Sequence, residues 1–290
     1  MALISLNGIS VGFGSAPILD NIDMQIERGE RVCLLGRNGA GKTTLMRVIS
    51  EDIAPQTGYI AAQPALKITS LTQKVPQSMP GSVFDVIVGG HGKTAKMLSQ
   101  YHKVSVELTR NPSDDLLKKL DSLHHDLEAT GSWQINTKAE TMISQLKLDA
   151  DADFDTLSAG LKRRTLLARA LVIDPDILML DEPTNHLDID SIDWLEDFLM
   201  RNIRTLLFVT HDRMFMRNLS TRIVDIDRGS LSSWSCDYDS YLKFKQQAID
   251  AELKHNEKFD KKLADEEDWI RKGIKARRVR NQGRVRSLQQ

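Results

Sequence analysis

The fold is decided by the stretch Gly36-Arg37-Asn38-Gly39-Ala40-Gly41-Lys42-Thr43, which continues into Thr44. Its spacing, a glycine, four residues and then Gly-Lys-Thr, is typical of a phosphate-binding loop. The apolar run 32–35 before it predicts a buried strand, and the residues after it predict a helix that begins near Lys42. A strand, a glycine-rich loop and a helix in this order predict nucleotide binding by an α/β fold.

The predicted loop suits phosphate for physical reasons. Its glycines let successive backbone N–H groups turn inward, and the following helix points the positive end of its dipole at the same place. We expect Lys42 to reach the β- and γ-phosphates and the Thr43 hydroxyl to bind Mg²⁺.

Two later apolar runs end in polar residues that suit the same chemistry. The run 177–180 predicts a buried strand followed by Asp181 and Glu182, and 205–210 predicts one followed by His211. Open parallel sheets place ligands at the carboxyl ends of their strands. We expect Asp181 to hold Mg²⁺ through water and Glu182 to orient or activate the attacking water. A histidine at His211 is placed to hydrogen-bond the terminal phosphate.

The residues before the loop alternate between apolar and polar types. This pattern predicts half-buried antiparallel strands at 3–11 and 18–26, and shorter strands are expected at 58–60 and 66–71. Phe13 lies on the turn between the first two strands. Its ring either stacks on adenine or packs against the edge of the sheet.

The segment 89–131 has the apolar spacing of helices instead of strands. Leucines and other apolar residues recur at helical intervals over 97–108 and 116–127, with a turn and a capping sequence at 111–115. We expect a helical hairpin, which is either part of an ordinary helical subdomain or an arm that contacts a partner.

A second turn precedes a helix later in the chain. It consists of Leu157-Ser158-Ala159-Gly160, before the helical pattern at 165–171. A serine and glycine at the amino end of a helix form another potential seat for an anion.

Composition bounds the class of protein. The 290 residues are 41% hydrophobic and 27% charged, with a net charge of −1, which excludes a uniformly basic nucleic-acid coat. The two cysteines, Cys33 and Cys236, fit a reducing cytosol and buried packing roles. No apolar run approaches the roughly 18–20 residues of a membrane span, and the first residues lack a signal pattern. We therefore expect a cytoplasmic protein without a membrane segment of its own.

Positive charge gathers at the end of the sequence. From Tyr241 onward, apolar pairs four residues apart predict a long helix. Residues 269–290 contain no acidic residue. They include Trp269, Arg271, Lys272, Lys275, Arg277, Arg278, Arg280, Arg284 and Arg286. Such a run is either a solvated face or a contact with nucleic-acid phosphates, and Trp269 suits stacking on unpaired bases.

In sequence order these motifs resemble those of an ATP-binding cassette of the ABC superfamily, over about residues 1–240. The resemblance implies that Phe13 stacks on the adenine of ATP. It implies that Gln73 contributes to the metal and catalytic site and links it to motion of the helical subdomain. It also implies that Ser158, in the signature 157–160, contacts the γ-phosphate of ATP held by an opposite cassette, and that Asp188 belongs to the inter-cassette loop. The signature departs from the family pattern at Ala159, where glycine is usual. The added methyl group either weakens the closed state or is tolerated there, since alanine can still adopt the geometry of a helix N-terminus.

Two features resemble the ABC-F family in particular, and its Uup-like subgroup. They are Thr184-Asn185-His186-Leu187-Asp188 and the tail that begins at Trp269. This resemblance implies an ABC-type P-loop ATPase core with an antiparallel β subdomain and an α-helical subdomain at 1–240, an arm inserted at about 92–130, and a helical, basic inter-cassette linker at 241–290. It further implies that the chain is a fragment of a two-cassette protein.

The function implied is a soluble ATP-driven switch. Members of ABC-F lack a membrane domain and act on ribosomes, and Uup-like members are also associated with DNA. We expect ATP hydrolysis to ADP and phosphate, weak in a single cassette, with ATP and Mg²⁺ as ligands and a second cassette and the ribosome or its RNA as partners. The alternatives are a DNA-binding ATPase in DNA maintenance and the ATPase subunit of a membrane transporter.

Overall fold

The computed structural model describes residues 2–14, 17–71, 76, 78–185, 187–248, 250–251, 257–258 and 260–262. The chain divides into two compact units, Met1–Tyr238 and Asp239–Gln290.

The chain begins with an antiparallel sheet. Among the described residues it has the order β2-β1-β4, formed by β1 (Ala2–Gly12), β2 (Pro17–Glu27) and β4 (Thr57–Ala62). Along β1 and β2, buried apolar residues largely alternate with more exposed residues, so that the apolar side chains gather on one buried face of the sheet. The predicted antiparallel pair is confirmed.

The second sheet holds the strands that end in the predicted functional residues. Its described strands have the order β5-β6-β7-β3-β8-β9, in which every neighbouring pair is parallel except β8 and β9. Their bounds are β3 (Arg31–Gly36), β5 (Ile68–Leu71), β6 (Ile177–Asp181), β7 (Leu206–Val209), β8 (Arg222–Asp227) and β9 (Ser230–Trp234). All residues of β6 and β7 are buried, as their continuous apolar sequences predict.

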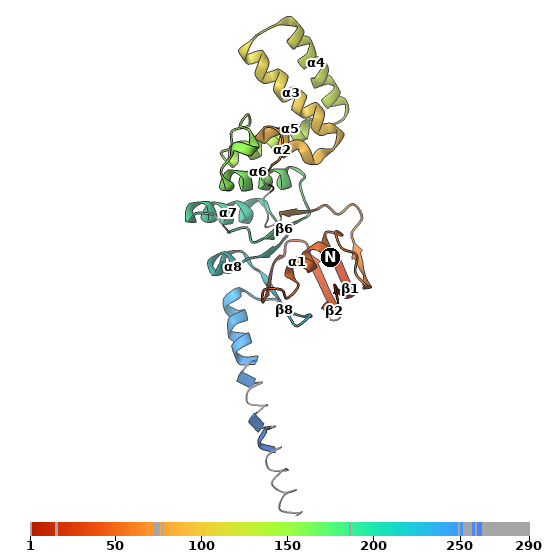
Figure 1. Ribbon diagram of the computed structural model, residues 1–290, viewed down its shortest axis with the longest axis vertical. Coiled ribbons are helices and arrows are strands. Elements are labelled where there is room, and N and C mark those ends of the chain that lie inside the picture. The colour runs from red at the N-terminus through yellow and green to blue at the C-terminus, as the bar shows by residue number, and fades with distance from the viewer. Residues whose placement is uncertain are drawn as a thin grey trace, which may run out of the picture. The chain divides into compact units, whose positions relative to one another are not determined.

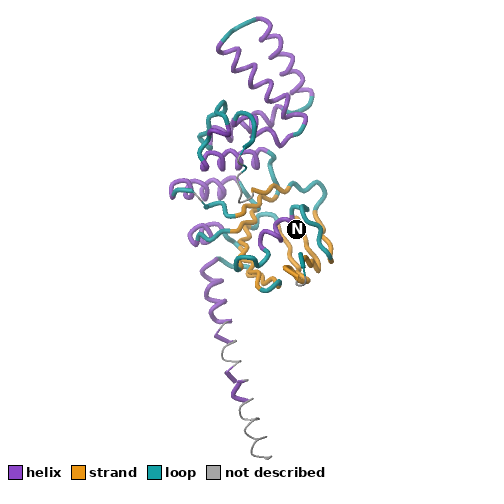
Figure 2. Tube along the Cα trace, in the orientation of Figure 1, coloured by secondary structure: helices purple, strands orange, loops and turns teal. Residues whose placement is uncertain are grey.

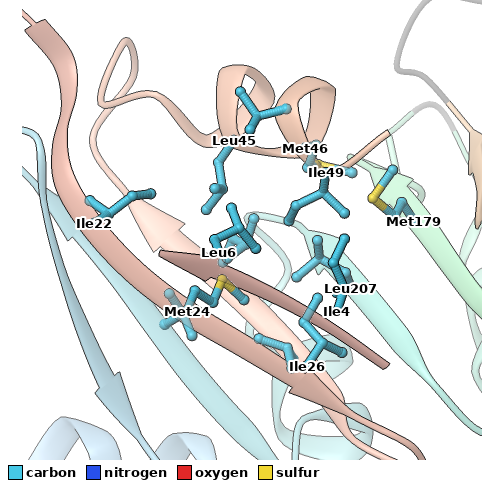
Figure 3. Packing of buried hydrophobic residues seen from close by; sticks show 14 of the residues in the cluster. Ile4, Leu6, Ile22, Met24, Ile26, Leu45, Met46, Ile49, Met179 and Leu207 are labelled. Atoms are coloured by element: carbon cyan, nitrogen blue, oxygen red, sulfur yellow. The ribbon is translucent and has the colours of Figure 1, made fainter. Parts of the chain in front are cut away.

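The helix α1 (Lys42–Ile49) lies between the two sheets and completes the main core. Figure 3 shows Leu45, Met46 and Ile49 of this helix packed over Leu6 of β1 and Leu207 of β7. The core thus fixes the helix that follows the glycine-rich loop against both sheets.

The remaining helices gather in a helical subdomain and along the parallel sheet (Figures 1 and 2). They are α2 (Val83–Val88), η1 (Gly89–His91), α3 (Lys93–Arg110), α4 (Asp114–Ala129), α5 (Trp133–Gln145), η2 (Phe154–Thr156), α6 (Ala159–Val172), α7 (Ile189–Asn202) and α8 (Arg213–Leu219). The sequence patterns did not assign α2, α5, α7 or α8.

The predicted helical hairpin is confirmed as α3 and α4, which lie side by side (Figure 1). Ser113 caps α4 by accepting a hydrogen bond from the Leu116 N–H at 3.3 Å, and two acids occupy the first turn. At the base of the hairpin, the Trp133 ring packs against Tyr101 and His124 at centroid distances of 5.1 and 4.6 Å.

Every described residue of the second unit is helical, which confirms the predicted helix over residues 241–248. Trp269 and the basic residues from Arg271 to Arg286 lie outside the described residues. Within the part of the chain that the structure describes, no helix is both long and apolar enough to cross a bilayer.

The core predicts a stability effect. Leu207 of β7 is fully buried in the core that includes α1, so that Leu207→Ala leaves a cavity and lowers the free energy of unfolding by about 2–5 kcal/mol. Leu117, 47% exposed on α4, provides the control: Leu117→Ala changes that free energy by no more than about 0.5 kcal/mol. Urea titration of both variants checks the difference, and equal losses would contradict the assigned core.

Candidate phosphate-binding site

The loop between β3 and α1 requires glycine at two positions. Gly36 has a φ of 146°, and a Cβ there would lie 2.6 Å from the carbonyl oxygen of Ile226. Gly41 has a φ of 107°, and a Cβ there would lie 2.8 Å from Cγ2 of Ile18. Larger residues would therefore strain the backbone and collide with the neighbouring strands.

The Lys42 ammonium group lies within the loop. Its Nζ donates hydrogen bonds to the carbonyl oxygens of Gly36 at 2.8 Å and Arg37 at 3.1 Å. These bonds direct the cation toward the space enclosed by the loop, next to the amino end of α1, where an anion is favoured.

Thr43 and Asp181 join the first turn of α1 to the end of β6. The Thr43 hydroxyl donates to Oδ2 of Asp181 at 3.0 Å. A hydroxyl and a carboxylate at this separation are hard oxygen ligands, which Mg²⁺ prefers when it also binds phosphate oxygens. The residues present thus fit a phosphate chain with its Mg²⁺.

Glu182 is buried and has an unusual backbone conformation. Its φ is 52°, in the left-handed region, which costs about 1–2 kcal/mol for a residue with a side chain. Its N–H donates to the Val209 carbonyl at 2.9 Å, and its Oε1 lies 3.4 Å from Nε2 of His211. Its Oε2 is buried and has no hydrogen-bond partner among the described residues, which leaves an acceptor for a ligand or water.

Arg163 of α6 holds the backbone of residues 181–185 by hydrogen bonds. Its Nη2 donates to the carbonyl oxygens of Asp181 at 3.4 Å and of Glu182, and its Nη1 donates to that of Asn185 at 3.4 Å. Burial lowers the pKa of the Arg163 guanidinium, while the charges of Glu182 and Asp181 act in the opposite direction.

Burial, helped by the charge of Glu182, raises the pKa of the Cys33 thiol far above its usual range. Cys33 is fully buried, so the thiol stays protonated and packs as a small apolar group.

The glycine-rich loop and the residues that follow β6 and β7 surround one open cavity of roughly 570 Å³, a size that suits a small-molecule ligand. It is lined by Ile18, Asn38, Gly39, Gly41, Lys42, Thr43, Thr44, Asp181, Glu182, Asn185, Val209 and His211. The structure therefore brings the loop, both predicted acids and His211 together at the carboxyl ends of β3, β6 and β7.

Other predicted residues lie elsewhere. Phe13 is 68% exposed and does not line the cavity. Ser158 caps α6 by accepting from the Leu161 N–H at 3.4 Å, and Ala159 is the first helical residue. Alanine at position 159 therefore adopts helical geometry. Gln73 lies outside the described residues.

Sequence reasoning missed Arg163, which holds the segment by hydrogen bonds, and Asn185, which lines the cavity. A signal for Arg163 exists in the helical spacing, because Arg163, Leu167 and Ala170 fall at i, i+4 and i+7 and are all buried. The charged neighbours Lys162 and Arg164 concealed this pattern.

Comparison with known proteins gives two family matches. The profile of a family described as ABC transporter matches residues 19–185, and another with the same description matches residues 224–290. In solved structures, a nucleotide-free ATP-binding cassette from an ABC transporter has a TM-score of 0.58 and 20% identity, covering 82% of this chain and 92% of that one.

Curated relatives are more similar in sequence. ATP-binding protein Uup of Escherichia coli K12 is 46% identical over 99% of this chain and 45% of its own length, and Uup of Haemophilus influenzae is 46% identical over 99% and 44%. Energy-dependent translational throttle protein EttA of Escherichia coli O6:H1 is 34% identical over 92% and 49%. The chain spans about half the length of these relatives.

A hydrogen-bonded carboxylate near the site predicts a pH effect. Asp188 caps α7, and hydrogen bonds from the Ser191 side chain and backbone hold the pKa of its carboxyl below the ordinary value. The lowered pKa means that its charge stabilises the fold above about pH 4 and loses this effect as pH falls through the folded-state pKa. The gap in thermal midpoint between wild type and Asp188→Asn should therefore close below that pH.

Thermal unfolding at several pH values checks this expectation. Asp121→Asn, on the exposed face of α4, serves as the control and should show no closing gap. A gap for Asp188→Asn that widens toward low pH would show that the sign is wrong.

Proposed function

The chain belongs to the ABC-F family of ATP-binding cassette proteins, and we propose that it is the ATP-binding and hydrolysing cassette of a switch that engages the ribosome. The observation that carries the ATPase part is the meeting of Lys42, the Thr43–Asp181 pair and Glu182 around one cavity.

Each predicted site residue has a separate role in this proposal. The loop N–H groups and Lys42 bind the β- and γ-phosphates, and Phe13 stacks on adenine. Thr43 and Asp181, with Gln73, would hold Mg²⁺, which would supply positive charge to neutralise the phosphates. Because phosphoryl transfer depends mainly on positioning and charge, these contacts orient the γ-phosphate for attack.

The buried Oε2 of Glu182 is suited to accept a hydrogen bond from the attacking water. The imidazole of His211, beside Oε1 and 67% exposed, reaches the terminal phosphate from the mouth of the cavity. Water is thus oriented by a carboxylate whose backbone is fixed before the nucleotide arrives.

The signature turn is proposed to serve a second cassette. Ser158 does not line this chain's own cavity, and its position at the amino end of α6 suits the γ-phosphate of a nucleotide held opposite. Asp188 lies in the loop between the cassettes. With 1–240 as the cassette and 241–290 as linker, hydrolysis is weak when this cassette is alone.

Translation is the proposed setting because a relative is named for it. EttA is described as an energy-dependent translational throttle protein. The eight basic residues of 271–286 offer phosphate contacts for ribosomal RNA, and the α3–α4 hairpin offers a further contact surface. We place this activity in the cytoplasm.

Replacing the proposed catalytic carboxylate separates binding from hydrolysis. In the full-length protein, Glu182→Gln, with the same change in any second cassette, should retain ATP affinity and abolish turnover. The closed form should then persist and co-sediment with ribosomes only when ATP is present. Sedimentation should fall when the arginines of 271–286 are neutralised, and it should weaken steeply with salt.

A matched control is Glu196→Gln. Glu196 is also buried but lies on α7, where its Oε2 accepts from Asn218 at 2.6 Å. The Glu196→Gln variant should hydrolyse ATP and should not accumulate an ATP-dependent complex with ribosomes. Collapse of ATP affinity in Glu182→Gln would refute its proposed role, and nucleotide-dependent binding to branched DNA in place of ribosomes would move the target to DNA.

A further inference from the structure

Arg163 is a buried cation whose hydrogen bonds to other described residues go to one short backbone segment. It is 6% exposed, and its guanidinium donates to the carbonyl oxygens of Asp181, Glu182 and Asn185. That segment leaves the end of β6 and carries both acids of the cavity. One side chain of α6 therefore supports the backbone on which the proposed metal ligand and catalytic carboxylate stand.

Glu182 is held from two sides by this arrangement. Its N–H donates to Val209 of β7, and its carbonyl oxygen accepts from Arg163. Its left-handed φ of 52° is disfavoured for a residue with a side chain, so surrounding bonds must maintain it. Because φ and ψ set the direction of the Cα–Cβ bond, the same bonds aim the Glu182 carboxylate into the cavity.

Packing alone does not explain an arginine here. The neighbouring buried positions of α6 are Leu167 and Ala170, and an apolar residue at 163 would avoid burying a charge. The Arg163 Nε is itself buried without a hydrogen-bond partner among the described residues. Burial of this charged group is therefore costly. Its planar set of N–H donors reaches three carbonyl groups, which a compact ammonium group would not span.

We propose that Arg163 is a positioning residue that couples α6 to the Glu182 carboxylate. It does not line the cavity, and it acts by holding the Asp181–Asn185 backbone. Ser158 caps the same helix. A nucleotide held by an opposite cassette that displaced α6 would therefore also shift the Arg163 guanidinium, which donates to the Glu182 carbonyl. This inference rests on the proposed ATPase function of the cavity.

The test compares Arg163→Lys and Arg163→Met with Arg169→Lys in the full-length protein, with the corresponding glutamate of any second cassette changed to glutamine. Arg169 lies on the same helix, but its Nη1 contacts Met79 instead of the cavity segment. Hydrolysis as a function of ATP concentration gives kcat and KM, and thermal unfolding reports whether each variant is folded.

Misplacement of a catalytic group by about 1 Å costs on the order of 100-fold in rate, so we expect kcat to fall between about 10- and 100-fold in Arg163→Met. KM for ATP should stay unchanged, because the loop and Lys42 are not displaced. Arg163→Lys should recover part of the loss, and Arg169→Lys should behave as wild type.

Unchanged kcat in folded Arg163→Lys and Arg163→Met would overturn the inference, as would a KM that rises as much as kcat falls. If the methionine variant does not fold, the lysine variant decides by the same kcat and KM criterion. Failure of the proposed function looks different, because wild type and Arg169→Lys would then also lack hydrolysis.

Discussion

The hydrogen bond between the Thr43 hydroxyl and the Asp181 carboxylate, 3.0 Å long, joins residues 138 positions apart in the chain. It forms because β3, β7 and β6 are parallel neighbours, so that the segments following each strand emerge at one edge of the sheet. Every other feature of the cavity depends on this alignment. A sheet with one of these strands reversed would carry Lys42 or Glu182 to the opposite edge.

The cavity also depends on how its buried charges are paired. Removing a carboxylate or a guanidinium from water is costly unless polar partners replace the water. Here Asp181 accepts from Thr43, Arg163 donates to backbone carbonyls, and each charge lies in the field of the others. This mutual support fixes the groups before ligand binding, and preorganisation is what an enzyme of phosphoryl transfer requires.

Local pattern was sufficient to predict much of this arrangement. Glycine spacing located the loop, and apolar runs located β6 and β7 together with the acids behind them, because these signals lie within a few consecutive residues. The sequence did not reveal α7 or the role of Arg163. A buried arginine looks like a surface residue until the carbonyl groups it meets, from a different segment, are known. The left-handed φ of Glu182 likewise depends on bonds to Val209 and Arg163, which only the tertiary structure brings together.

The most direct test of the account is a double-mutant cycle for ATP affinity with Thr43→Val and Asp181→Asn, measured by calorimetry with Mg²⁺ and again with chelator. If the two side chains hold one metal ion on the nucleotide, their effects are non-additive by about 0.5–3 kcal/mol with Mg²⁺, and this coupling shrinks without it. Effects that add within about 0.5 kcal/mol in Mg²⁺, or a coupling indifferent to the metal, would contradict the assignment of this cavity as the Mg²⁺-ATP site.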